Sequence, residues 1–266
     1  MAKVKKRRIR SKTSGVDLPT ESKGIGAATS HTLFIYGPEG IGKSTFGSHA
    51  PSPLFIATEA GLNFLDVMTE PCPDWDKFVG IVDALEASKS QRYKTVVIDT
   101  ADNAIDQCQS YACDKLGIEH PADEEWGKGY SAVRMEFNKQ ITRLALLDMR
   151  FILISHQKSV EIKGRVMKTT KIVPTLSNSG RRVILPMCDF IGHCTFKEGR
   201  DGEATSERII NFEPSEYHEA KDRSGLLPKI IPLDYEVFNG YMDGSTVKRS
   251  KSKTTAKRKV RRKVRR

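Results

Sequence analysis

The chain has no long hydrophobic run and few cysteines. None of its 266 residues lies in an apolar stretch that approaches the length of about 18 residues needed to span a membrane. The basic N-terminal segment is not followed by an apolar core, so we expect no secretory signal. The five cysteines are an odd number without a Cys-x-x-Cys pair, which argues against a disulfide framework and a structural zinc site. These absences predict a soluble protein in a reducing compartment, the cytoplasm.

Acidic residues are absent from both ends of the chain. Residues 1–12 contain seven Lys and Arg, and residues 247–266 contain twelve. The rest of the chain contains the other 25 of the 44 basic residues and all 33 acidic residues, so it carries a net charge of −8. We expect a flexible basic arm at 1–30, a folded domain at 31–240 and a disordered basic tail at 241–266. Such a tail binds nucleic acid with little sequence preference, and a role in solubility or nuclear targeting is the alternative.

Apolar runs and helical patterns alternate through the first part of the folded region. Four runs without polar alternation are typical of strands buried on both faces, at 31–36, 53–57, 95–98 and 151–154. Helical periodicity lies between them, at 75–85 (with Asp74 as the cap), 105–116 and 130–144. This order predicts an α/β fold with a mostly parallel sheet. Residues 158–176 have the pattern of a hairpin or mobile loop, and strand-like runs at 190–196 and 208–212 predict a β-rich extension.

A glycine-rich motif follows the first predicted strand directly. Residues 37–44 read Gly-Pro-Glu-Gly-Ile-Gly-Lys-Ser and match the P-loop pattern G-x-x-x-x-G-K-[ST]. Its glycines let backbone N–H groups surround phosphate oxygens, the Lys43 ammonium reaches the β- and γ-phosphates, and the Ser44 hydroxyl binds Mg²⁺. A glycine-rich turn before a helix is the alternative. The motif assigns ATP binding to Gly37, Pro38, Glu39, Gly40, Ile41, Gly42, Lys43, Ser44 and Thr45.

An acidic residue ends the third predicted strand. The run Tyr93-Lys-Thr-Val-Val-Ile-Asp99 places a carboxylate at the carboxyl end of a strand, where α/β proteins bind ligands. Together with Ser44, Asp99 is the predicted Mg²⁺ ligand. A cap for the helix over 101–115 is the alternative role of Asp99.

Two further groups of polar residues end predicted strands. Thr100, rather than a general base, follows Asp99, whereas Glu59 ends the second strand, which we expect to lie next to the P-loop strand. His156 and Gln157 end the fourth strand, where hydrogen bonding to the terminal phosphate can distinguish ATP from ADP. A turn residue facing solvent is the alternative for Glu59, and an ordinary polar strand end is the alternative for His156 and Gln157.

Taken together, these motifs resemble the RecA-type ATPase core. The chain is similar to small phage-encoded nucleotide-binding proteins that keep only this core, a group that includes RecA-like single-strand annealing proteins. Residues 126–130, Trp-Gly-Lys-Gly-Tyr, are also similar to that group. The resemblance covers roughly residues 30–215 and implies a RecA-like fold in the host cytoplasm, with Glu59 as the activator of water and Gln157, beside His156, as the phosphate sensor.

The same resemblance implies that the segment after the fourth strand contacts single-stranded DNA. The basic residues of this segment are Lys158, Lys163, Arg165, Lys168 and Lys171, against one acid, Glu161. Charge alone favours phosphate contact, and a solvated basic hairpin is the alternative. The resemblance also implies a ring or filament of identical subunits, in which Lys168, Lys171, Arg181 or Arg182 contacts the nucleotide of the next subunit.

The sequence thus favours an ATPase that binds single-stranded DNA in recombination, annealing or replication, with other proteins of these processes as further partners. No separate DNA-binding or oligomerising domain is evident, which makes binding or annealing a better-supported expectation than strand exchange. A P-loop kinase of a small molecule is a second reading, although Arg181-Arg182 is the one arginine cluster in the core. A module that binds ATP without hydrolysing it is a third, and the motifs do not separate a helicase loader or packaging ATPase from the first.

Overall fold

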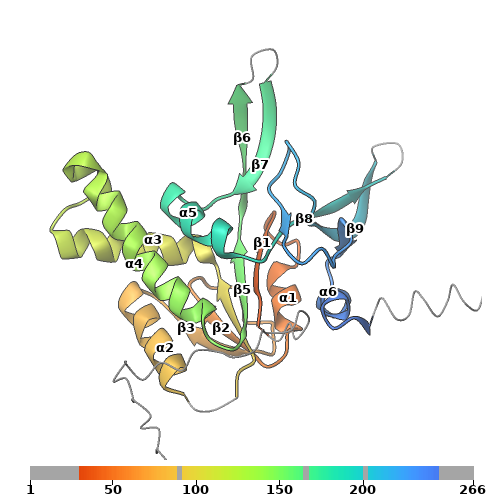
Figure 1. Ribbon diagram of the computed structural model, residues 1–266, viewed down its shortest axis with the longest axis horizontal. Coiled ribbons are helices and arrows are strands. Elements are labelled where there is room, and N and C mark those ends of the chain that lie inside the picture. Colours follow the sequence, from red (N-terminus) through yellow and green to blue (C-terminus); the bar gives the residue numbers. More distant parts are fainter. Residues whose placement is uncertain (1–29, 89–91, 164–167, 200–202, 246–266) are drawn as a thin grey trace, which may run out of the picture.

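The computed structural model describes residues 30–88, 92–163, 168–199 and 203–245 (Figure 1). The expected basic arm and most of the expected basic tail lie outside these residues. The strands are β1 (Thr32–Tyr36), β2 (Pro53–Ala57), β3 (Met68–Pro71), β4 (Thr95–Asp99), β5 (Arg150–Ser155), β6 (Gln157–Lys163), β7 (Lys168–Pro174), β8 (Phe190–Glu198), β9 (Ala204–Asn211), β10 (Lys221–Asp222) and β11 (Ile230–Pro232). The helices are α1 (Lys43–Ser48), α2 (Trp75–Ala87), α3 (Ala101–Leu116), α4 (Lys128–Ala145), α5 (Asn178–Met187) and α6 (Tyr235–Met242), with 3-10 turns at Pro121–Asp123 and Glu125–Gly127.

The main sheet confirms the predicted α/β architecture. Its strand order is β11-β9-β8-β1-β5-β4-β2-β3, with β10 paired to β8. The six strands from β8 to β3 are parallel, whereas β9, β10 and β11 pair antiparallel. Of the two runs predicted as a β-rich extension, 190–196 is β8, which joins the parallel part beside β1, and 208–212 lies largely in the antiparallel β9. The expectation that the strand before Glu59 lies next to the P-loop strand is wrong. Strands β5 and β4 separate β1 from β2, because the chain returns to insert β5 beside β1.

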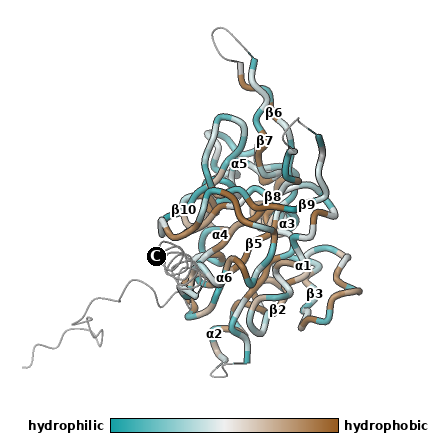
Figure 2. The backbone as a smooth tube through the Cα atoms, turned by 90° about the vertical axis from the view of Figure 1, so that its right-hand side faces the viewer, coloured by the Kyte–Doolittle hydropathy of each residue, from teal (hydrophilic) through white to brown (hydrophobic). Residues whose placement is uncertain are grey.

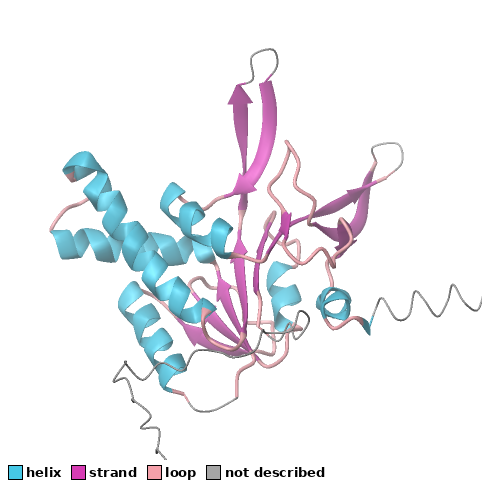
Figure 3. Ribbon diagram, viewed as in Figure 1, coloured by secondary structure: helices cyan, strands magenta, loops and turns pink. Residues whose placement is uncertain are grey.

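Each face of the sheet carries its own layer of apolar side chains. Along β1, Phe34 and Tyr36 pack on the face covered by α2, α3, α4 and α5, while Leu33 and Ile35 pack on the face covered by α1 and α6. This division follows from the two-residue period of a strand. Figure 3 shows the two helical layers on either side of the strands, and Figure 2 shows brown, hydrophobic segments concentrated in the middle of the molecule. Burial on both faces explains why these strands lack polar alternation.

A two-stranded hairpin projects from the end of β5. Strands β6 and β7 pair antiparallel with Gln157 opposite Pro174 and Lys163 opposite Lys168, and they form a sheet separate from the main one. The hairpin extends beyond the body of the protein in both Figure 1 and Figure 2. The hairpin pattern predicted for residues 158–176 is therefore confirmed. The folded part also continues past the expected boundary at 240, because α6 ends at Met242, which is buried.

Candidate nucleotide-binding site

The P-loop connects β1 to α1 and is fixed by close packing. A Cβ atom added at Gly37 would lie 2.4 Å from the carbonyl oxygen of Cys194 on β8, so only glycine fits there. Gly42 has φ 106°, a left-handed conformation that glycine adopts without strain. The buried Lys43 Nζ donates to the carbonyl oxygens of Gly37 and Pro38 over 2.9 and 2.8 Å. Burial lowers the pKa of the Lys43 ammonium, and these carbonyls hold it inside the loop.

The two predicted metal ligands are in direct contact. Ser44 Oγ donates to Asp99 Oδ2 over 2.6 Å, although β1 and β4 are not neighbours in the sheet. Both residues meet because parallel strands end at one edge, and α1 begins at that edge. Burial raises the pKa of the Asp99 carboxyl, the Ser44 hydrogen bond opposes this rise, and the Glu59 carboxylate adds to it. A hydroxyl and a carboxylate are the hard oxygen ligands that suit Mg²⁺, so the residues present fit this ion.

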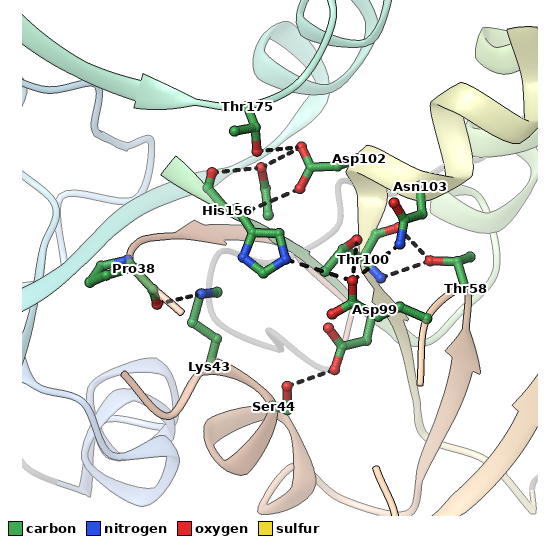
Figure 4. A network of polar contacts seen from close by, with 12 residues as sticks. Pro38, Lys43, Ser44, Thr58, Asp99, Thr100, Asp102, Asn103, His156 and Thr175 are labelled. Carbon is green, nitrogen blue, oxygen red and sulfur yellow. Dashed lines mark hydrogen bonds and ion pairs between the residues drawn. The ribbon is translucent and has the colours of Figure 1, made fainter. Parts of the chain in front are cut away.

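The Glu59 carboxylate contacts three polar side chains, two from the start of α3 and one from the end of β5. Its Oε2 lies 3.1 Å from Asn103 Nδ2 and 3.5 Å from Thr100 Oγ1. His156 Nε2 lies 3.6 Å from the same oxygen. Strand pairing explains this convergence. Ala57 on β2 lies opposite Asp99 on β4, and the segments that follow both strands continue into the site (Figure 4). The arrangement holds one carboxylate oxygen in place.

These groups line one open cavity of about 600 Å³. Most of the predicted site residues contribute to its wall: Glu39, Gly40, Gly42, Lys43, Ser44, Thr45, Glu59, Asp99 and His156. Gly37, Pro38 and Ile41 of the motif do not line it, and Ile41 is buried in the core instead. The segment after Glu59 adds further wall residues, of which Phe64 is fully exposed: Ala60, Gly61, Leu62, Phe64 and Leu65. No sequence motif pointed to Phe64 or to Thr100 as wall residues.

Gln157 is directed away from this cavity. Its Oε1 lies 3.0 Å from Nε2 of His193 on β8, and the His193 ring stands between Tyr36 and His218, with ring centroids 5.1 and 5.3 Å away. Because β6 starts at Gln157 while His156 lies between β5 and β6, the two neighbouring side chains leave the backbone in different directions. The structure therefore brings His156, and not the Gln157 side chain, to the cavity wall.

Asp102, in the first turn of α3, was not singled out by the sequence. Its Oδ1 accepts hydrogen bonds from Ser155 Oγ and Thr175 Oγ1, and its Oδ2 accepts one from the His156 backbone N–H, each over 2.9 Å. Figure 4 shows the carboxylate between His156 and Thr175. One side chain thus joins the helix after Asp99 to both ends of the hairpin. The polar run that follows Asp99 was the available sequence signal.

The basic residues of the hairpin are divided between its two faces. Strand register places Lys158 and Lys171 on one face and Lys168 on the other, because residues paired across an antiparallel ladder share a face. Lys158 Nζ donates to the Thr175 carbonyl oxygen over 3.4 Å. Arg165, the fifth predicted residue, lies outside the described part of the chain.

Several of these cations have acidic neighbours within the chain. Lys168 Nζ lies 3.5 Å from Glu161 Oε2 on the opposite strand. Lys171 Nζ and Arg181 Nη2 lie 3.8 and 2.5 Å from the same Glu219 Oε1. The exposed Lys168–Glu161 pair is of the weak surface kind, whereas the pairs with Glu219 are largely shielded from solvent. Three of the four residues considered for contact with a neighbouring subunit therefore hold intramolecular ion pairs.

A second cavity of about 330 Å³ adjoins the P-loop on the side of α6. Gly42 and Thr45 line both cavities, so the two adjoin at the P-loop. The other walls come from His49, Arg208, Leu233 and Tyr235 among others. The Arg208 guanidinium approaches Gly42 so closely that a Cβ there would lie 3.1 Å from Nη1.

The fold and the site define a P-loop nucleotide-binding protein with a mostly parallel α/β core. A family model described as an AAA domain (AAA_24) matches residues 29–224, and the chain belongs to that family. The SPbeta prophage-derived uncharacterized protein YorG of Bacillus subtilis (strain 168) is 26% identical over 162 residues, which cover 59% of this chain and 47% of that protein. The chain thus spans about half the length of this relative.

A solved structure, the crystal structure of the RadB recombinase, aligns with a TM-score of 0.41 and 15% sequence identity. The alignment covers 68% of this chain and 79% of that one. Within the described residues, no helix is both long and apolar enough to cross a membrane.

Proposed function

We propose that this protein hydrolyses ATP with Mg²⁺ and that single-stranded DNA bound at the β6–β7 hairpin stimulates the reaction. One observation carries the proposal. Lys43, the Ser44–Asp99 pair and the Glu59–His156 pair converge on one cavity, and Asp102 connects the end of that cavity to the hairpin. The process served is recombination, annealing or replication.

Each group at the cavity has a separate task in the proposed reaction. Lys43 and the P-loop N–H groups bind the β- and γ-phosphates. Ser44 and Asp99 hold Mg²⁺, whose charge, when bound, neutralises phosphate oxygens. Glu59 orients and deprotonates the attacking water, while Asn103 and His156 keep its carboxylate pointed into the cavity. The second cavity, at Gly42 and Arg208, accommodates the nucleoside part of ATP.

The hairpin supplies the proposed link to DNA. A bound strand that shifts β6 relative to β7 changes the positions of His156 and Thr175 against Asp102. Since Oε2 of Glu59 lies next to His156, this movement reaches the group that orients water. The hairpin lysines take the DNA phosphates in place of Glu161 and Glu219, and the basic tail adds unspecific affinity.

We also propose that the protein is phage-encoded, acts in the host cytoplasm and assembles as a homo-oligomer, in company with other recombination or replication proteins. Similarity to a prophage-derived protein supports the phage origin. Arg182 supports assembly, because it is exposed and has no acidic partner among the described residues, which leaves it available to a neighbouring subunit or to a polyanion.

The decisive experiment compares ATP hydrolysis without nucleic acid, with single-stranded DNA and with duplex DNA. The intact chain is measured beside a chain that ends at residue 246, which lacks the basic tail. Stimulation by single strands that survives removal of the tail, and that Lys43→Ala abolishes, is the expected result. Stimulation that disappears with the tail would place DNA sensing outside the hairpin. Rapid phosphoryl transfer to a small acceptor, without a DNA effect, would indicate a kinase instead.

A further inference from the structure

A third cavity lies between the first two turns of α4 and those of α5, away from the nucleotide site. Its volume is about 400 Å³, and its wall consists of Gly127, Tyr130, Ser131, Arg134, Asn178, Ser179 and Arg182. The wall contains two arginines and no acid. Neither guanidinium has an acidic partner within the residues that the structure describes, so both remain available to an external anion.

Trp126 directly precedes Gly127 of the cavity wall, and its side chain is almost fully exposed. Its relative exposure is 92%, whereas the other tryptophan, Trp75, has 1%. The Trp126 backbone has φ 59° and ψ 23°, a left-handed conformation that a bulky residue rarely adopts. Strained conformations of this kind persist where the surroundings enforce them, and they cluster at functional positions.

Contacts on both sides of Trp126 fix the backbone of this segment. His120 and Asp123 close a turn with reciprocal hydrogen bonds, and the His120 ring meets Tyr130 edge-on at 6.0 Å. Gly129 packs so tightly on this turn that a Cβ would lie 2.3 Å from the Pro121 carbonyl oxygen. The backbone around Trp126 is therefore fixed onto the start of α4, and its indole ring faces solvent.

We propose that this face is a second contact surface for single-stranded DNA, on which one base stacks on Trp126 and adjacent phosphates bind Arg134 and Arg182. An exposed indole takes an unpaired base, whereas the bases of a duplex are already stacked on each other. Two arginines without an acid complement a polyanion, and the hydroxyls of Ser131 and Ser179 offer further donors. The inference takes its partner from the proposed function but does not depend on the hairpin lysines.

The order of these elements along the chain supports binding of one continuous DNA strand to both the hairpin and this surface. The hairpin ends at Pro174, and α5 starts at Asn178 with Ser177 as its cap. A strand that leaves the root of the hairpin thus meets the first two turns of α5, which carry Ser179 and Arg182. Figure 1 shows α5 between the hairpin and α4.

Tryptophan fluorescence tests this surface directly, because the chain has two tryptophans and one of them is buried. The full-length protein is titrated with oligo(dT), while the anisotropy of a labelled oligonucleotide reports total binding. We expect quenching of the exposed Trp126 and none of Trp75, so that Trp126→Phe abolishes the quenching. Trp126→Ala is expected to weaken binding roughly ten-fold.

Salt dependence tests the arginines. The double variant Arg134→Ala/Arg182→Ala should lower the slope of log affinity against log salt by about 1.4, since each phosphate contact on a single strand contributes about 0.7. Lys139→Ala, which removes an exposed charge from the same helix α4, is the matched control and should leave quenching unchanged.

Each remaining outcome is decisive. Saturating binding by anisotropy without Trp126 quenching would overturn this inference and leave the proposed function intact. A change of oligomeric state in Trp126→Ala, with unchanged DNA affinity, would assign the face to protein contact and also overturn it. No binding of oligo(dT) at all would overturn both this inference and the DNA part of the proposed function.

Discussion

Thr175 and Asp102 are joined by a hydrogen bond of 2.9 Å from Oγ1 to Oδ1, which connects the residue after the hairpin to the helix that follows Asp99. Hydrogen bonds to a charged group contribute about 1.5–3 kcal/mol each. With Ser155 Oγ and the His156 N–H as further donors, the Asp102 carboxylate fixes the root of the hairpin relative to the nucleotide cavity. A rigid connection of this kind lets an event at one end alter the other.

Glu59→Gln is expected to lower the rate of ATP hydrolysis about 10²- to 10⁴-fold, because the amide cannot accept the proton of the attacking water. Affinity for ATP should stay close to that of the wild type, since Glu59 is not part of the P-loop. Glu70→Gln, which removes a carboxylate from the neighbouring strand β3 outside the cavity, is the control. A variant that hydrolyses ATP at the wild-type rate would remove Glu59 from the mechanism.

The pH dependence of stability should report the buried Asp99. Its folded-state pKa lies above 3.8, so the folded protein binds a proton that the unfolded chain releases. Without Mg²⁺, this contribution to stability is present below pH 3.8 and is lost as the pH rises through the folded-state pKa. Asp99→Asn should flatten this decline, measured by denaturant unfolding across pH. Adding Mg²⁺ should stabilise the wild type and not the variant, and equal gains would contradict the metal-binding role.

His193 should make the fold sensitive to acid. Burial, assisted by the neighbouring His218, lowers the pKa of His193 from 6.5 to about 4. The unfolded state therefore binds the proton first, and stability should fall as the pH drops from 6.5 to about 4, by up to about 3 kcal/mol. His193→Gln should lose this part of the decline in urea unfolding, while the exposed His49→Gln keeps it. Identical pH profiles for both variants would contradict this account.

Gly37→Ala should destabilise the protein by about 1–3 kcal/mol, because the new methyl group overlaps the Cys194 carbonyl oxygen. Gly80→Ala is the matched control: this glycine lies within α2, and nothing approaches its Cβ position within 4 Å. Removing a glycine from a helix interior should raise stability by about 0.5–1 kcal/mol. A thermal or urea midpoint that Gly37→Ala leaves unchanged or raises would show that the P-loop does not pack as described.

Local patterns were sufficient to predict the elements and motifs of the parallel core. Continuous apolar runs identified β1, β2, β4 and β5, and the Asp74 side chain caps α2 as predicted, accepting from the Lys77 N–H over 2.8 Å. Helix α5 was not predicted, because Gly180 and Pro186 both disfavour a helix. Packing of Val183 and Ile184 in the core outweighs these preferences.

Relations between distant segments were not predictable from the sequence. The strand order that separates β1 from β2 is set by tertiary packing, and spacing along the chain does not encode it. The direction of the Gln157 side chain depends on where β6 begins, and its partner His193 lies 36 residues away. Asp102 resembles any acidic residue in the first turn of a helix until the hairpin folds back against it.

Asp102→Asn tests the proposed coupling between DNA and ATP hydrolysis most directly. Hydrolysis is measured in the full chain with and without single-stranded DNA, and Asp106→Asn, one turn further along α3, serves as the control. The account predicts that Asp102→Asn keeps ATP binding and basal hydrolysis but loses stimulation by roughly 5- to 150-fold, the range of typical coupling energies. Full stimulation of Asp102→Asn by single-stranded DNA would contradict it.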